Sequence, residues 1–590
     1  MLLTLLSITP RVALEDLSLH RGLRTLQDTL AAVCLFPRLK ALSLRARDNW
    51  ERRLDLAVLK PLLALERFSC SGWQSVGLKG TPVLPQLSFL EISSTRSTAI
   101  DAALLSLHEL WISQTRTLQL RGLHLRLPQL SKLSLYKVNM GAVSWPALPQ
   151  LKSLTAVECP ELTVAAPAEL SHLASLTLHW SRDCWEAGGR WLHAAPSSLQ
   201  HMSFYGSTND WSQPPPLSSV TQLTSLSCNS PAIIPYLHPL AQLQQLELSM
   251  NSVTDITLEH SGWLCGLSSL RQLCFGYRVN CLDSAIERLK QALVELSLYG
   301  EERVVHDSLV AVQLFPRLRV LTLVLPDTDI GGRLNLRALQ PLPALERLAC
   351  GAWERVDLRG STRLRQLTSL EIWDAGSVDI DATLPSLQEL VVMGADTLGL
   401  TGKRLQLPQL THLNLTFIDM VAVNWRALPQ LAELLVASCE ELNTVALPEL
   451  GCLTSLSLDY GQHSESWQVA DGILQAAPSS LLSLSITGLE EEEWLQPPML
   501  SSMPQLTSLS SRSPAIIAQL GPLSRLQHLE FPWHSATDLS LEHLDCLCGL
   551  TSLRQLEFGI TVRNRDAERR LEVLRRVLPP GCILDQPMRS

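Results

Sequence analysis

The sequence predicts an α/β solenoid, in which stacked repeats each add one strand to a parallel sheet. Three observations lead to this fold class. The pattern Leu-x-x-Leu-x-Leu, with other hydrophobic residues allowed in place of Leu, recurs 24 times along the 590 residues. Neighbouring copies lie 20 to 28 residues apart, a period that is typical of repeat solenoids. The copies also fall into two blocks of twelve that share one order of spacings.

The second Leu of each copy is here called the marker residue. In the first block the markers are Leu17, Leu42, Phe68, Leu90, Leu110, Leu133, Leu154, Leu176, Met202, Leu226, Leu246 and Leu273. In the second block they are Leu296, Leu321, Leu348, Leu370, Leu390, Leu413, Leu434, Leu456, Leu484, Leu509, Leu529 and Leu556. The spacings of the two blocks agree within two residues at every step, which indicates an internal duplication.

Local identities support the duplication. The segment Ser230–Ile234 (SPAII) returns as Ser513–Ile517, and Cys265–Leu273 (CGLSSLRQL) returns as Cys548–Leu556 (CGLTSLRQL). We therefore expect a first twelve-repeat block over residues 1–290 and a second over 291–590, joined in one continuous solenoid. The charged, helix-like segment near residues 560–590 is expected to cap the last repeat, because an open solenoid end exposes core.

The pattern itself predicts a strand in each copy. In good copies such as Leu39–Leu44 (LKALSL) and Leu410–Leu415 (LTHLNL), the Leu-x-Leu alternation places two Leu on one face and the residue between them on the other. A single strand cannot bury that apolar face alone, whereas stacked neighbours make a continuous core.

These copies resemble the leucine-rich repeat family over nearly the whole chain, in its degenerate ribonuclease-inhibitor-like or F-box-type form and without an F-box. The resemblance implies a curved superhelix of about 24 repeats, with a parallel sheet on the concave side and a mixed helical and irregular convex side. The family usually has Asn or Cys three residues after the last core Leu. Cys159 and Cys439 fit that place, but Thr115 and Ala395 do not, so we expect irregular turns rather than an Asn ladder.

The connections between strands are predicted from Pro and from apolar spacing. In ten of the 24 copies Pro lies two residues before the first Leu, where it ends any preceding helix and favours extended backbone. Short connections have room only for turns or extended segments. Helix-like spacing appears in the longer connections, namely Leu23–Leu35, Cys184–Ala195, Asp283–Leu293, Val304–Leu314 and Trp467–Ala477.

Composition excludes several classes of protein. A net charge of −9 disfavours a nucleic-acid binder, and the longest apolar runs are far too short to span a membrane. Met1–Pro10 lacks the basic start and long apolar stretch of a signal peptide. The 14 Cys are scattered without a paired cluster, which favours a reducing, intracellular location. We expect a cytoplasmic protein, with the cytoskeleton or the cilium axoneme as further possible locations.

No catalytic motif is present, so we expect no enzyme activity, no cofactor and no metal site. The pair of Gly402 and Lys403, within Gly399–Arg404 (GLTGKR), lacks the spacing and the following Ser or Thr of a P-loop. Neither a Gly-x-Ser-x-Gly elbow nor a His-Glu-x-x-His site occurs, and the 15 His are dispersed.

Function is therefore expected on the solvent-facing positions of the strands. These form three columns, one residue before, one after and three after each marker. In the central column 13 of 24 residues are Ser or Thr, five are Glu and none is Lys or Arg. Across all three columns 11 acidic residues face five basic ones. Such a mildly acidic, hydroxyl-rich surface favours a basic protein partner and repels phosphate backbones.

Two places on this surface combine an aromatic ring with carboxylates, as interface anchors often do. We predict partner binding at Glu91, Glu109 and Trp111 and, in the second block, at Glu371, Trp373 and Glu389. The alternative interpretation is that these are ordinary exposed residues copied by the duplication.

The expected function is a non-catalytic protein-interaction scaffold, by analogy with the family. One alternative is the substrate-recognition part of a ubiquitin-ligase adaptor, although Leu14–Leu19 is already a repeat and leaves no room for an F-box. Another alternative is a structural component of a cytoskeletal or axonemal assembly. An immune-type sensor would need a nucleotide-binding module, which is missing.

Overall fold

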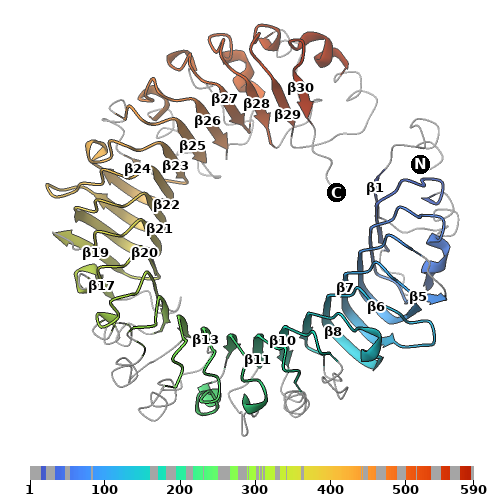
Figure 1. Cartoon of the computed structure of the whole chain (residues 1–590). Coiled ribbons are helices and arrows are strands. Elements are labelled where there is room, and N and C mark those ends of the chain that lie inside the picture. Colours follow the sequence, from blue (N-terminus) through green and yellow to red (C-terminus); the bar gives the residue numbers. More distant parts are fainter. Residues whose placement is uncertain are drawn as a thin grey trace. The chain divides into compact units, whose positions relative to one another are not determined.

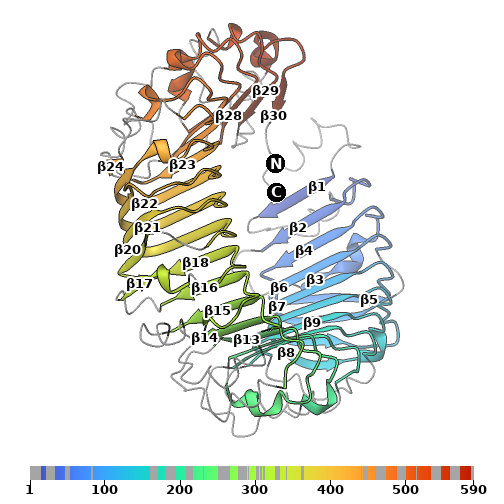
Figure 2. The same ribbon diagram turned by 60° about the vertical axis from the view of Figure 1, so that its left-hand side comes forward.

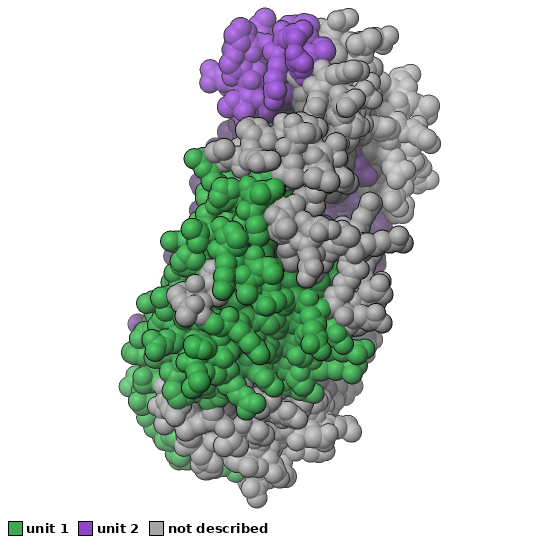
Figure 3. Space-filling model, turned by 90° about the vertical axis from the view of Figure 1, so that its right-hand side faces the viewer, with its two compact units in different colours: residues 1–292, 590 green, residues 293–589 purple. Residues whose placement is uncertain are grey.

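The structure is a computed structural model of the chain. It describes residues 15–20, 33–46, 53–80, 84–159, 170–180, 195–206, 217–229, 231–249, 266–276, 289, 291–300, 305, 309, 312–325, 332–339, 342–360, 364–439, 441–442, 450–459, 473–487, 500–512, 514–532, 546–558 and 572–585. It divides into two compact units, Met1–Ala292 and Leu293–Arg589, which are coloured separately in Figure 3. That the two blocks form one continuous solenoid stays a prediction.

In each unit the marker residues lie on parallel strands of one sheet, here called the inner sheet because its strands line the inner side of the unit's curve (Figure 1). In the first unit these strands are β1 (Asp16–His20), β2 (Ala41–Arg45), β4 (Arg67–Ser71), β6 (Phe89–Ala102), β7 (Glu109–Leu120), β8 (Lys132–Val143), β9 (Ser153–Val157), β10 (Ser175–Trp180), β11 (His201–Gly206), β12 (Ser225–Cys228), β13 (Gln245–Ser249) and β14 (Gln272–Gly276). Marker pairs with marker, as in Leu17 with Leu42 and Phe68 with Leu90.

The second unit repeats this order, and its central strands follow one another in Figure 2. Its inner strands are β15 (Glu295–Tyr299), β16 (Val320–Val324), β18 (Arg347–Gly351), β20 (Ser369–Ala382), β21 (Glu389–Leu400), β22 (His412–Val423), β23 (Glu433–Ala437), β25 (Ser455–Asp459), β26 (Ser483–Thr487), β27 (Ser508–Ser511), β28 (His528–Phe531), β29 (Gln555–Phe558) and β30 (Ile583–Asp585). The predicted parallel solenoid is confirmed, and all 24 markers lie on strands. β30 adds a strand that the repeat pattern does not predict, with Leu584 opposite Leu556.

The core lies behind the inner sheet and includes the markers and the residues two positions later. Leu413 is 1% exposed and Leu415 is fully buried, and both positions are likewise buried in nearly every other repeat whose burial is described. Burying one such Leu side chain stabilises the fold by roughly 1.5–3 kcal/mol, so the repeated pair accounts for much of the cohesion between neighbouring repeats. Turns that contain Pro lead the chain into these strands. The N–H of Leu130 donates to the backbone oxygen of Leu127 at 3.2 Å across Pro128, and the N–H of Leu39 donates to that of Phe36 at 3.1 Å across Pro37.

Behind the inner sheet the described connections are mostly strands and short 3-10 turns, and helices are few among the described residues. The 3-10 turns are η1 (Leu56–Leu59), η2 (Trp145–Ala147), η4 (Leu217–Ser219), η5 (Pro231–Tyr236), η6 (Leu336–Leu339), η7 (Trp425–Ala427), η10 (Leu500–Ser502) and η11 (Pro514–Gln519). Helix occurs at residues 473–475, 546–548 and 572–577, and the single described residues 33, 289, 305, 309 and 312 are also helical. Most of the five predicted connecting helices lies outside the described residues.

A second sheet, here called the flank sheet, runs beside the short-spaced repeats of each unit. In the first unit it contains β3 (Arg53–Asp55), β5 (Ser75–Gly80) and the second halves of β6, β7 and β8. In the second unit it contains β17 (Arg333–Asn335), β19 (Arg355–Gly360), the second halves of β20, β21 and β22, and β24 (Glu441–Leu442). The extended segments predicted for short spacings are thus paired strands.

The chain turns from the inner sheet to the flank sheet at a left-handed residue four positions after the marker. In repeats three to seven of the first unit, residues with positive φ occupy this corner: Gly72, Ser94, Gln114, Lys137 and Glu158. The same corner of the second unit is formed by Ala352, Asp374, Gly394, Phe417 and Ser438. Non-Gly residues resist this conformation, so the burial on both sides of each corner must hold it in place.

Candidate partner-binding surface

The inner sheet carries its three predicted columns on the side away from the core. In β16, for example, buried and partly exposed residues alternate along Val320–Val324. Because strands pair marker to marker, residues of one column are direct neighbours on adjacent strands, at a spacing of about 4.8 Å. Glu91 therefore lies between Ser69 and Trp111 in the central column.

Two of the three predicted residues of the first unit, Trp111 and Glu109, are in direct contact. Trp111 is 40% exposed, and its Nε1–H donates to Glu109 Oε2 at 3.3 Å. Lys132 Nζ lies 5.0 Å from the centre of the Trp111 ring and 3.8 Å from Glu109 Oε2. The ring of Phe89 is 6.2 Å from that of Trp111, centre to centre. The structure thus brings Trp111 and Glu109 together and places Glu91 beside them.

Each of three aromatic rings in this region has a cation from the chain itself. Arg67 lies 5.0 Å from the centre of the Phe89 ring, and Lys137 lies 5.1 Å from that of Tyr136, in addition to Lys132 at Trp111. Cation–π contacts of this kind are worth about 0.5–1 kcal/mol at exposed sites. The hydrogen bond with Tyr136 and the carboxylate of Glu158 raise the pKa of Lys137. We call Phe89, Trp111 and Tyr136 with their three cations the first-unit cluster.

The predicted residues of the second unit lie on the matching strands but in a different arrangement. Trp373 stands three residues after its marker, whereas Trp111 stands one after. The indole packs over Gly351, where an added Cβ would lie 2.1 Å from Trp373 Nε1. Glu389 accepts a hydrogen bond from Ser369 Oγ at 3.1 Å, and Glu371 pairs in register with Ala349 and Val391.

An apolar ridge that was not predicted from the sequence adjoins Trp373. Met393 pairs in register with Trp373, and Val391 precedes it by two residues on the same face of β21. On β22 the corner residue Phe417 is 65% exposed, and Met393 is 40% exposed. Phe417 has φ 53°, which is rare for an aromatic residue. We call Trp373, Val391, Met393 and Phe417 the second-unit ridge.

Carboxylates surround the second-unit ridge on four strands. They are Glu371, Asp374, Glu389, Asp396, Asp419 and Glu433, all of them exposed. Among the described residues of the inner sheet nearby, His412 Nε2 lies 3.3 Å from Glu433 Oε2, and Arg347 stands on β18 in the column of Glu389. An exposed apolar group with a charged rim is typical of a protein-binding site.

A chain of hydroxyl groups crosses the later strands of the first unit. Tyr205 Oη and Ser227 Oγ are 2.7 Å apart, and Ser227 donates to Glu247 Oε2 at 2.9 Å. Burial, with a smaller contribution from Glu247, raises the pKa of the neighbouring Cys274 thiol to about 12, so the thiol is protonated at neutral pH and is a poor nucleophile. Within the described part of the chain, no group of three or more His, Cys, Asp or Glu could hold a metal ion.

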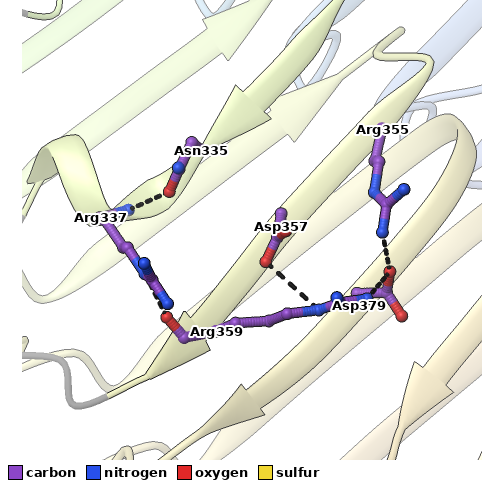
Figure 4. Close-up of polar contacts among 6 residues, drawn as sticks. All are labelled: Asn335, Arg337, Arg355, Asp357, Arg359 and Asp379. Atoms are coloured by element: carbon purple, nitrogen blue, oxygen red, sulfur yellow. Dashed lines mark hydrogen bonds and ion pairs between the residues drawn. The ribbon is translucent and has the colours of Figure 1, made fainter.

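An ion-pair network lies on the flank sheet of the second unit (Figure 4). Asp379 accepts hydrogen bonds from Arg355, at 2.7 Å, and from Arg359, and Arg359 also lies 3.6 Å from Asp357. Arg337 Nε donates to the backbone oxygen of Arg359 at 2.6 Å. These contacts join η6, β19 and β20, and their contribution to the stability of the sheet is a sufficient explanation for them.

This network gives a prediction on stability. We expect Asp379→Asn to lower the free energy of unfolding by about 0.5–1 kcal/mol, because two guanidinium groups lose their shared carboxylate. Asp357→Asn, which removes only the longer contact, should cost less. Urea denaturation at low and at high salt measures both variants. If both variants lost the same free energy of unfolding, or if the loss were as large at high salt as at low salt, the contribution assigned to these ion pairs would be wrong.

Comparisons with known proteins identify the class of fold. No protein-family model matches the chain, and no curated protein sequence is significantly similar to it. Among solved structures, the TLR13–ssRNA13 complex matches with 17% identity and a TM-score of 0.52, over 89% of this chain and 79% of that one. The circular LRR protein CroV588 matches with 14% identity and a TM-score of 0.42, over 98% of this chain and 99% of that one. An internalin (InlF) from Listeria monocytogenes matches with 16% identity and a TM-score of 0.25, over 63% of this chain and 82% of that one.

The parallel register of the strands and the likeness to TLR13 establish a leucine-rich-repeat solenoid. In the described residues no helix is long and apolar enough to cross a membrane.

Proposed function

We propose that the chain is a non-catalytic scaffold that binds a protein partner on its inner sheets. The observation that carries this proposal is the gathering of exposed aromatic and charged side chains in the first-unit cluster and around the second-unit ridge. Aromatic residues and Arg provide most of the binding energy in protein interfaces, whereas scattered Ser and Thr provide little. The network on the flank sheet, by contrast, is internally paired.

The predicted location is intracellular. In support of it, the eleven cysteines within the described residues are free thiols. Free cysteines in this number suit a reducing compartment, where disulfides do not persist.

The proposal is tested by replacing the two tryptophans of the inner sheets. We expect Trp111→Ala with Trp373→Ala to lower partner recovery at least five-fold in affinity purification with mass spectrometry, because both rings lose their contact area. Gln119→Ala with Thr397→Ala, two partly or fully exposed flank-sheet positions, serves as the matched control. If the tryptophan variant recovered as much partner as the parent, with equal amounts of folded protein compared, the proposal would be wrong.

A further inference from the structure

The duplication allows one surface to be compared with its own copy. The central strands of the two units share their length and, on the inner sheet, their register, and equivalent residues differ by 280 in number. The four ridge residues Trp373, Val391, Met393 and Phe417 correspond to Ser93, Trp111, Ser113 and Lys137. A common backbone therefore carries two different surfaces, and the difference must reside in the side chains.

The charges around these positions have diverged in opposite directions. Three of the carboxylates that surround the ridge, Asp374, Asp396 and Asp419, correspond to Ser94, Arg116 and Asn139 of the first unit. His412 and Phe417 correspond to Lys132 and Lys137, which lie against the aromatic rings of the first-unit cluster. The first unit supplies cations for its own rings, whereas the second unit presents an apolar ridge with six carboxylates around it.

We propose that the second-unit ridge binds a protein segment with an apolar anchor residue flanked by Lys or Arg. The inference rests on the proposed function and specifies the chemistry of the partner. An apolar side chain would contact Met393, Val391 and the exposed face of Trp373, because these three are adjacent in the register. Flanking cations would pair with Asp374 and Asp396, on either side of the corner at Gly394.

The corner itself favours this arrangement. Gly394 has no side chain between Asp374 and Phe417, and an added Cβ there would lie 2.8 Å from Asp374 Oδ1. Phe417 holds an exposed aromatic ring on a left-handed backbone, a conformation that residues with a side chain rarely adopt. A partner that covers the ring would remove its apolar surface from water. An acidic partner would instead meet six like charges, which accounts for the selectivity.

The probe is a random twelve-residue peptide library displayed on phage and selected on the full chain. Enriched peptides are resynthesised, and their dissociation constants are measured at low and high salt. We expect at least one large apolar residue with two or more Lys or Arg, and affinity that falls several-fold as salt rises. An acidic or uncharged consensus, or no enrichment, overturns the inference.

Substitutions taken from the first unit locate the binding site without disturbing the fold, because the same backbone already carries those residues. We expect Met393→Ser with Phe417→Lys, and separately Asp374→Ser with Asp396→Arg, each to weaken the basic peptides roughly ten-fold. Gln119→Ala, at an exposed flank-sheet position of the first unit, should leave their affinity unchanged, and Trp111→Val reports whether the first-unit cluster takes part in binding the peptides.

The variants also separate failure of this inference from failure of the proposed function. Peptides that lose affinity only with Trp111→Val would overturn the second-unit assignment but leave inner-face binding intact. If no inner-face variant weakened peptide binding, the result would contradict both the second-unit assignment and the proposed function.

Discussion

Gly72→Ala should destabilise the first unit by about 3–4 kcal/mol, one of the two largest effects expected from the structure. Gly72 is a corner residue with φ +79°, and an added Cβ would lie 2.3 Å from the backbone oxygen of Ala46. Real Cβ atoms do not approach that closely, and a backbone atom cannot rotate away as a side chain can. One of the two strands that meet here, β2 or β4, would have to move.

The second unit provides the control for this prediction. Ala352 occupies the equivalent corner with φ 60° and is 2% exposed, so a methyl group fits there. Ala352→Gly should therefore change the free energy of unfolding by less than about 1 kcal/mol, since relief of backbone strain offsets the greater freedom of the unfolded chain. Urea denaturation followed by circular dichroism measures both variants. If Gly72→Ala lowered the free energy of unfolding only slightly, the backbone at this corner would be able to relax and the prediction would be wrong.

Removing one hydroxyl from a buried threonine cluster should cost about 2–3 kcal/mol. Thr95 Oγ1 lies 2.9 Å from both Thr98 Oγ1 and Thr115 Oγ1, and all three residues are 1% exposed. Thr95→Ala removes the shared partner of both hydroxyl groups. Thr115 Oγ1 still donates to the backbone oxygen of Ser113 at 3.3 Å, whereas the buried Thr98 hydroxyl loses its contact with Thr95. Desolvation of the Thr98 hydroxyl without that partner accounts for much of the expected loss.

The second unit again supplies the control, because Ala375, Val378 and Ala395 fill the same three places and are buried. The triple variant Thr95→Ala, Thr98→Val, Thr115→Ala should lie within about 1 kcal/mol of the parent, since replacing all the partners removes the unpaired groups. Denaturation midpoints of the single and triple variants test this. A triple variant less stable than Thr95→Ala would contradict it.

The sequence was sufficient to predict the strands, because burial of the marker residues determines the register. A shift of one residue would move every Leu of a strand to the solvent side, so the Leu-x-Leu alternation excludes that alignment. The predicted central column is accordingly in register throughout each unit. The position three residues after the last core residue, where an Asn ladder would stand, has other side chains here. Thr115 belongs to the buried hydroxyl cluster, and Cys159 Sγ donates to the backbone oxygens of Val157 and Leu135.

The corners and the flank sheet could not be predicted in the same way. Only Gly72 and Gly394 among the ten corner residues are glycine, so local preference gives almost no sign of a left-handed turn. The corner at Phe417 is held by the buried neighbours Leu415 and Ile418, which propensity does not describe. Packing between repeats therefore decides this part of the fold.

The second-unit ridge was missed for a related reason. Met393 follows Val391 and Val392 in an unbroken apolar run, in which periodicity cannot separate exposed from buried residues. Burial separates them: Val392 is fully buried and Met393 is 40% exposed. The acidic residues Glu371 and Glu389 were found because charge on a strand marks a solvent-facing position.

Photo-crosslinking in cells tests inner-face binding most directly. A photoreactive phenylalanine analogue is placed at Met393 on the inner sheet and, in a separate variant, at Thr397 beyond the corner on the flank sheet of the same strand. Partner binding on the inner face predicts that the Met393 variant crosslinks to one main protein, through a segment rich in apolar and basic residues, and that the Thr397 variant does not. Crosslinks from Thr397 alone, or to an acidic segment, would contradict the account.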